Sequence, residues 1–200
     1  MLYSCYKLTS VDLTPLAGWV NVTNADSLLS NCSGLTSVDF TPLAGWVNVT
    51  NANSLLTNCY GLTSVDFTPL DSWANVTSAN SLLYRCIGLT SVDLTPLAGW
   101  VNVINASYSL YGCSSLTSID LTPLAEWVKM TSNSEFISSC KNLIFISILA
   151  NTPFTLSSSS SLNNGNDCPI YVPDSAVDVY KTATNWSAYS SRIKPISEKQ

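Results

Sequence analysis

Five aspartates recur along the chain at a fixed spacing of 27 residues, each inside a short segment in which apolar and polar residues alternate. They are Asp12, Asp39, Asp66, Asp93 and Asp120. Side chains two residues apart in an extended segment point to the same face, so a serine shares that face with each aspartate. These serines are Ser10, Ser37, Ser64, Ser91 and Ser118. A face with one carboxylate and one hydroxyl per repeat predicts a binding surface for a polar, basic or polyhydroxylated ligand.

The carboxylate column has an electrostatic cost that needs an explanation. Equal charges about 5 Å apart repel by roughly 1 kcal/mol in water, and by more near a protein surface. A bound cation or cationic ligand would offset this repulsion. Alternatively, each carboxylate accepts local hydrogen bonds from hydroxyls such as those of Ser10 and Thr14, or from backbone amides. The second alternative needs no ligand, and the sequence leaves both open.

Six cysteines also hold one place in successive repeats, which at first suggests metal or disulfide chemistry. They are Cys5, Cys32, Cys59, Cys86, Cys113 and Cys140. Buried free thiols are the favoured interpretation, because free cysteine behaves as a small apolar residue and a disulfide requires specific Cα spacing and side-chain directions. The chain has no histidine, so it lacks the commonest general base and metal ligand. We therefore expect no catalytic residues, no metal site and no cofactor.

A tryptophan column could serve as an exposed stacking platform or as packing inside the molecule. Its members are Trp19, Trp46, Trp73, Trp100 and Trp127. Valine follows four of them, among them at Val20, Val47 and Val101, which favours the packed alternative. The amides Asn24, Asn51 and Asn105 form a further column, which we expect to hydrogen-bond the backbone of a turn.

These columns arise from five 27-residue units that start at Leu8, Leu35, Leu62, Leu89 and Leu116. In the first unit, Val11 and Leu13 should point inward from a short strand. Thr14 and Pro15 should cap and start a helical turn. The apolar spacing then predicts a one-sided helical segment over 25–32. A partial unit precedes Leu8 and a diverged one starts at Leu143, so the chain opens inside a repeat, as a fragment or with an uncapped first turn.

One such unit cannot bury its apolar face alone, but stacked copies can. We therefore predict an α/β solenoid with one short parallel strand per 27-residue repeat. The solenoid should occupy residues 1–150, with five full repeats over 8–142. Residues 151–200 should form a Ser/Asn-rich linker over 151–168, followed by a small α/β cap. The cap should contain a strand at 170–173 and a helix over about 176–184.

The repeat core V-T-N-A-x-S-L-L-x-x-C-x-x-L-T-S-V-D-[LF], at 22–40, resembles the leucine-rich repeats of BspA-like bacterial surface proteins. The resemblance covers about residues 1–150 and implies a right-handed leucine-rich-repeat array. The family more often has Met or Phe where this chain has Ala25, Leu28 and Leu29, and its units are usually shorter. Family members are mostly secreted or surface-attached, and several are adhesins that bind host proteins. Related arrays also occur in phage-encoded proteins, and no family catalytic motif transfers.

The net charge, the length of the apolar runs and the repetition exclude several classes of function. The net charge of −5 argues against a nucleic-acid partner, because binding phosphate needs a basic surface. The mostly apolar run 143–150 is too short to span a bilayer, so this segment should not insert into a membrane. Repetition indicates a scaffold, since catalysis needs one unique constellation. We expect a non-enzymatic ligand-binding or adhesion module, extracellular or at a bacterial cell surface, whose partner is a protein or glycan on a host or neighbouring cell. The alternative is a phage virion component, such as a tail or receptor-binding accessory protein.

Overall fold

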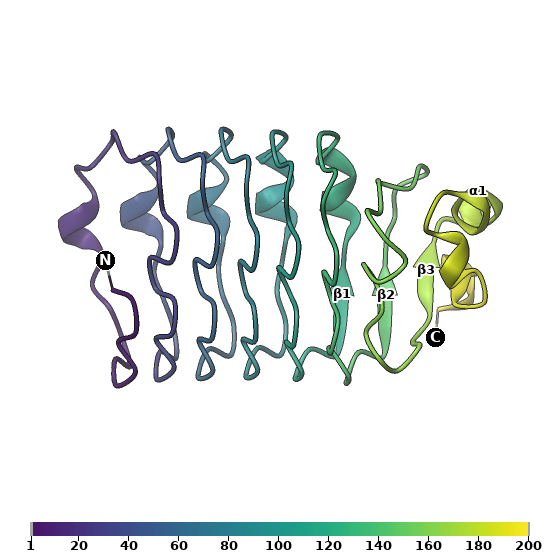
Figure 1. Ribbon diagram of the computed structural model, residues 1–200, viewed down its shortest axis with the longest axis horizontal. Helices are drawn as coiled ribbons and strands as arrows, with labels where there is room; N and C mark the ends of the chain where they lie inside the picture. The colour runs from purple at the N-terminus through teal and green to yellow at the C-terminus, as the bar shows by residue number, and fades with distance from the viewer. Residues whose placement is uncertain (1, 200) are drawn as a thin grey trace.

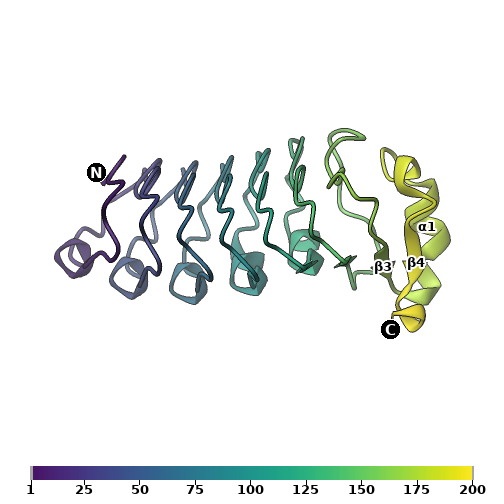
Figure 2. The ribbon, with the colours of Figure 1, turned by 90° about the horizontal axis from the view of Figure 1, so that it is seen from below.

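The computed structural model describes residues 2–199, which form a continuous stack of rungs from one end of the molecule to the other (Figures 1 and 2). Each 27-residue unit makes one rung, with an extended segment, a short 3₁₀ helix and a return segment. Backbone hydrogen bonds join neighbouring rungs on both sides. The Thr36 N–H donates to the Thr9 carbonyl at 3.2 Å, and the Ala25 N–H donates to the Asn51 carbonyl at 2.8 Å. The units therefore stack in register as a solenoid.

The extended segments have the expected inward and outward alternation. In β1 (Ser118–Asp120), Ile119 is 2% exposed whereas Asp120 lies on the surface. β1 pairs in parallel with β2 (Phe145–Ser147), which opens the diverged sixth unit. The sheet continues through β3 (Ile170–Val172) to β4 (Ile193–Pro195), in the order β1-β2-β3-β4.

The expectation of a strand in every repeat is wrong for the first four units, whose extended segments form no regular ladder. Stacked aromatic rings in these rungs lie 6.1–6.3 Å apart, as in the pair Phe40 and Phe67. Neighbouring strands in a sheet are only about 4.8 Å apart. The rings therefore stack at a wider spacing than paired strands, although single backbone hydrogen bonds still join the extended segments, as between Thr36 and Thr9. The sixth unit has no 3₁₀ helix after its strand, and its β2 pairs with β1 of the fifth unit.

A 3₁₀ helix follows each extended segment, with proline in its first turn. These helices are η1 (Thr14–Leu16), η2 (Thr41–Leu43), η3 (Thr68–Leu70), η4 (Thr95–Gly99) and η5 (Thr122–Glu126). The expected capping role of threonine is wrong, because Thr14 is the first helical residue. The Thr14 N–H instead donates to Asp12 Oδ1 at 2.9 Å, so the aspartate before it supplies the missing acceptor.

The helical segment expected over 25–32 is also wrong; the return segment is a series of turns. Ser27 and Asn31 have φ values of 55° and 61°, in the left-handed region where a right-handed helix cannot continue. Backbone N–H groups of alternate residues donate to the next rung, as from Leu29 to the Leu55 carbonyl at 3.0 Å. The turns still bring Ala25 and Leu28 into the core, which is why the apolar spacing imitated a helix.

Residues 151–168, expected to be a linker, form a further turn of the solenoid. Phe154, Leu156 and Leu162 are buried. Asn133 Nδ2, in the preceding rung, donates to the Thr155 carbonyl at 2.7 Å, and Asn133 Oδ1 accepts from the Ser157 N–H at 2.9 Å. The Ser- and Asn-rich composition was misleading, because several of these polar side chains bond to the preceding rung, as Ser157 Oγ and Ser161 Oγ do by donating to Asn133 Oδ1 at 3.0 and 2.8 Å.

The last residues form the expected cap at the end of the stack (Figure 1). After β3 come η6 (Asp174–Ala176), α1 (Val177–Thr182) and η7 (Ser187–Tyr189), then β4 and η8 (Ile196–Glu198). Phe145, at the last unit of the array, is half-buried beneath this cap. Its ring meets Tyr171 edge-on at 6.1 Å, and Lys199 Nζ lies 3.8 Å from its centroid.

Candidate functional site

The structure brings the ten predicted site residues onto one face, in register. All five aspartates are exposed, at Asp12, Asp39, Asp66, Asp93 and Asp120. The serines are exposed at Ser10, Ser37, Ser64 and Ser91, and half-buried at Ser118. We call these ten residues the Ser/Asp stripe. It is a continuous polar surface with one carboxylate and one hydroxyl on each of five rungs.

Every aspartate in the stripe makes the same local hydrogen bond. Its Oδ1 accepts from the backbone N–H of the threonine two residues later, at 2.8–2.9 Å in all five units. Hydrogen bonds from that threonine, first through its hydroxyl and then through its backbone, lower the pKa of Asp12, Asp39 and Asp66. These bonds hold each carboxylate in place at the start of the 3₁₀ helix and give it a hydrogen-bond partner within the protein.

The cysteine column is a set of buried free thiols over most of its length. The thiols of Cys32, Cys59, Cys86, Cys113 and Cys140 each lie 3.0–3.3 Å from the carbonyl oxygen 30 residues earlier. Burial raises the pKa of Cys59 and of Cys140 to about 12, so these thiols stay protonated and unreactive. Cys5 is half-buried.

The packed interpretation is correct for four of the five column tryptophans. Trp46, Trp73, Trp100 and Trp127 are buried, and each indole N–H donates to the carbonyl 30 residues earlier at 2.8–3.1 Å. Trp19, in the first rung, is 47% exposed. In the cap, Trp186 repeats the arrangement by donating to the Phe154 carbonyl at 2.8 Å. The sequence analysis missed Trp186 because it falls outside the 27-residue register.

The amide column is structural as well. Asn24, Asn51 and Asn105 each accept a backbone N–H two residues later through Oδ1, at 2.9–3.0 Å. Within residues 2–199 no three His, Cys, Asp or Glu side chains gather closely enough to hold a metal ion. No helix in the described part of the chain is long and apolar enough to cross a membrane.

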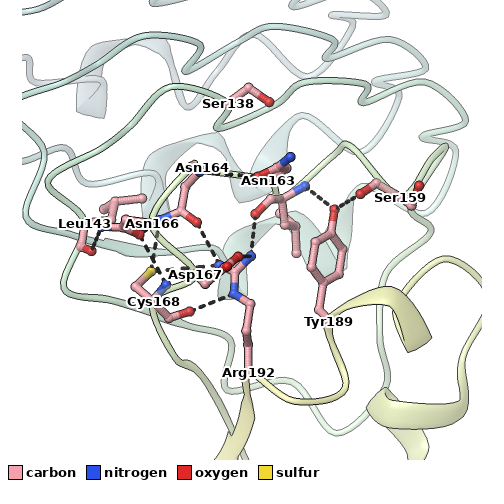
Figure 3. Close-up of polar contacts among 12 residues, drawn as sticks. Ser138, Leu143, Ser159, Asn163, Asn164, Asn166, Asp167, Cys168, Tyr189 and Arg192 are labelled. Carbon is pink, nitrogen blue, oxygen red and sulfur yellow. Dashed lines mark hydrogen bonds and ion pairs between the residues drawn. The ribbon is translucent and has the colours of Figure 1, made fainter.

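A buried arginine, which the sequence analysis did not single out, joins the cap to the last turn of the solenoid (Figure 3). Arg192 is 7% exposed; its Nε donates to the Cys168 carbonyl at 2.8 Å and its Nη1 to the Leu162 carbonyl at 3.1 Å. Its Nη2 donates to Asn164 Oδ1 at 2.9 Å, and Asp167 lies 4.0 Å away. With its donors engaged by the protein itself, Arg192 stabilises the cap and is not free for a ligand.

No protein-family model and no curated protein matches the chain. A solved internalin is similar to it. This is the internalin inlF from Listeria monocytogenes str. 4b F2365, with 15% sequence identity and a TM-score of 0.19. The match covers 88% of this chain and 66% of the internalin chain, so it spans slightly less than two thirds of that protein. A TM-score of this size does not establish a common fold.

Proposed function

We propose that this chain is a non-enzymatic binding module that contacts its partner through the Ser/Asp stripe. The observation that carries the proposal is the register of the five rungs, which places ten hydroxyl and carboxylate side chains in line on one exposed face. The column thiols that could act as nucleophiles are buried and protonated over most of their length. Repeated, identical groups suit multivalent contact with an extended partner better than a single chemical step.

The chemistry of the stripe defines the class of partner. The hydrogen bonds to Asp12, Asp39 and Asp66 all use Oδ1, and these carboxylates remain exposed and ionised. A row of carboxylates beside hydroxyls complements a basic protein segment or a polyhydroxylated glycan, and it repels an anionic polymer. The proposed location is extracellular or at the cell surface. It rests on the resemblance to BspA-like repeats and on a chain in which only 10% of residues are charged.

The test is a binding screen of the 200-residue chain on glycan and protein arrays, compared with a variant in which all five stripe aspartates are replaced by asparagine. Asparagine keeps an Oδ1 acceptor, so the local turn survives while the charge is lost. We expect binding to fall and the melting temperature to hold or rise, because repulsion along the column is removed.

A matched control removes five acidic charges outside the stripe, at Asp26, Asp71, Glu126, Asp178 and Glu198. This control should bind like the unmodified chain. Equal loss in both variants would show that only net charge matters. Unchanged binding of the stripe variant to an identified partner would exclude the stripe as the recognition surface.

A further inference from the structure

The five units are not identical, and their differences gather in the return segment. The strand motif L-T-S-V-D changes only once, at Ile119. By contrast, the place held by Ser30 in the first unit is held by Tyr84 and Tyr111 in the third and fourth. A repeated surface offers the same groups on every rung, whereas selective recognition needs groups that occur once. The return segment is therefore the place to look for a second site.

A cleft of about 350 Å³ opens on this side, between the third and fifth units. Its lining includes Tyr84, Arg85, Tyr111, Ser114, Ser139 and Lys141. The rings of Tyr84 and Tyr111 are stacked with centroids 5.0 Å apart and planes at 9°. Tyr108 packs edge-on against Tyr111 at 6.0 Å, so the two stacked rings are held in a fixed orientation. We call this surface the Tyr/Arg cleft.

Arg85 occupies a backbone position that does not suit arginine. Its φ is 55°, in the left-handed region, where residues other than glycine, asparagine and aspartate are uncommon. The same column holds Asn31, Asn58, Gly112 and Ser139 in the other units. A Cβ at Gly112 would lie 3.1 Å from Arg85 Cγ, so the glycine leaves room for the long side chain. The guanidinium lies 6.0 Å from the centre of the Tyr60 ring.

Arg85 also interrupts a ladder of amides. Asn58 Nδ2 donates to Asn31 Oδ1 at 2.7 Å, which links the first and second rungs. Among the described residues, Asn58 Oδ1 is the buried side-chain oxygen or nitrogen without a hydrogen-bond partner. An asparagine in place of Arg85 would be positioned to donate to it in the same way. Arg85 therefore lowers the stability of the fold in two ways: its backbone is held in the left-handed region, and Asn58 Oδ1 beside it has no hydrogen-bond donor. Residues that lower stability in this way are concentrated at functional sites.

The charges and donors of the cleft define what fits it. Arg85 and Lys141 are exposed cations, and of the described residues that line the cleft none is acidic. The ion pair found within residues 2–199 is that of Arg192 with Asp167, so neither cleft cation is neutralised by a carboxylate. Backbone N–H groups of the cleft already have hydrogen-bond partners within the protein. The Arg85 N–H donates to the Tyr111 carbonyl at 2.6 Å. Likewise, the Gly112 N–H donates to the Ser138 carbonyl at 2.7 Å.

A peptide would therefore find few backbone partners here, whereas a sugar would meet hydroxyls, aromatic rings and unpaired cations. We propose that the Tyr/Arg cleft binds a carboxylate-bearing sugar of an acidic glycan. Arg85 receives the sugar carboxylate, which its planar guanidinium can hold with two parallel hydrogen bonds. Tyr84 and Tyr111 pack against the ring, and Ser114 and Ser139 hydrogen-bond its hydroxyls. This site is separate from the stripe, which repels anions.

The test measures binding of trigalacturonic acid and 3′-sialyllactose to the 200-residue chain by isothermal titration calorimetry. Arg85→Asn is the informative variant, because it restores the repeat residue at this position. We expect it to weaken binding of the acidic sugar at least tenfold and to raise the melting temperature. A merely structural arginine would lower the melting temperature when replaced. The neutral counterparts, lactose and methyl-esterified trigalacturonate, should bind at least tenfold more weakly than the acids.

Lys129→Asn is the matched control, because it also replaces a lone cation with the residue that other units carry, as at Asn102. It should leave sugar binding within twofold. Failure of both acidic sugars to bind would overturn the proposal. So would equal weakening by Lys129→Asn and Arg85→Asn, which would indicate net charge alone. A hexaglutamate peptide that binds as tightly as the sugars would assign the cleft to acidic peptides instead. Variants of the Ser/Asp stripe test the proposed function separately and should retain sugar binding.

Discussion

Each stripe aspartate combines a hydrogen-bond acceptor with a charge, and substitution separates the two. Asp66 Oδ1 accepts the Thr68 N–H at 2.8 Å, at the first residue of η3. Asp66→Ala removes this acceptor and should lower the melting temperature, because the first turn loses its cap. Asp66→Asn retains an acceptor and should leave the melting temperature near that of the unmodified chain. Differential scanning fluorimetry distinguishes the two. Equal melting temperatures for both variants would show that the local hydrogen bond is unimportant.

The lowered pKa values of Asp12, Asp39 and Asp66 give a second prediction at this scale. A carboxyl whose pKa is lowered by folding stabilises the folded state above its ordinary pKa, and this contribution is lost as the pH falls through the lower folded value. The melting temperature should therefore decrease as the pH drops below about 3.8, the ordinary aspartate pKa. The triple Asn variant should lose less stability over the same range. If the melting temperature of this variant depended on pH in the same way as that of the unmodified chain, the three aspartates would not be the groups responsible.

For single elements, the sequence predicted which side chains point into the core better than it predicted the type of secondary structure. Alternation placed Ile119 inward and Asp120 outward, because a pleated segment with one buried face admits one register. The return segment was misread as a helix, because its turns bury Ala25 and Leu28 at a spacing that a helix also produces. The left-handed φ values of Ser27 and Asn31 and the hydrogen bonds to the next rung distinguish the turns from a helix. Residue type alone does not predict either feature at these positions.

The contribution of the indole hydrogen bonds of the column tryptophans to stability can be tested by replacing tryptophans from two rungs. Trp73 is fully buried, and its Nε1 donates to the Leu43 carbonyl at 3.1 Å. Trp73→Phe keeps an aromatic ring but removes one of the two hydrogen bonds that this carbonyl accepts, the other coming from the Trp46 N–H at 2.9 Å, which should cost about 0.5–1.5 kcal/mol. Trp19→Phe, in the first rung, should change stability little, because this side chain is 47% exposed. Urea denaturation measures both free energies of unfolding. Equal effects would mean that the buried hydrogen bond does not contribute.

At the scale of the whole molecule, stability depends on how the stack ends. The sequence predicted the cap from the pattern of β3 and α1, but it did not predict that 151–168 continues the solenoid. That part was missed because its pairing is between distant polar side chains, such as Asn133 with Ser157, which composition does not reveal. The role of Arg192 was missed for the same reason, since its partners come from the preceding turn.

Removing the Arg192 side chain should loosen this end of the stack. Arg192→Ala leaves the buried carbonyls of Cys168 and Leu162 without donors, at about 1–3 kcal/mol for each. We expect a lower melting temperature and faster proteolysis within 151–168. Lys194→Ala, which removes an exposed cation from β4, is the control and should behave like the unmodified chain. Resistance of the Arg192 variant to proteolysis would show that the cap is held by apolar packing alone.

If partners bind the Ser/Asp stripe, amide hydrogen–deuterium exchange should slow in the rungs that carry it. A partner identified on the arrays would be added to the 200-residue chain, and amide exchange compared with and without it. We expect slower exchange in the extended and helix-start segments of several rungs, at 9–16, 36–43 and 63–70, because a partner on the stripe covers the turns in which the aspartates accept their hydrogen bonds. Unchanged exchange in these segments, with protection confined to other parts of the chain, would contradict it.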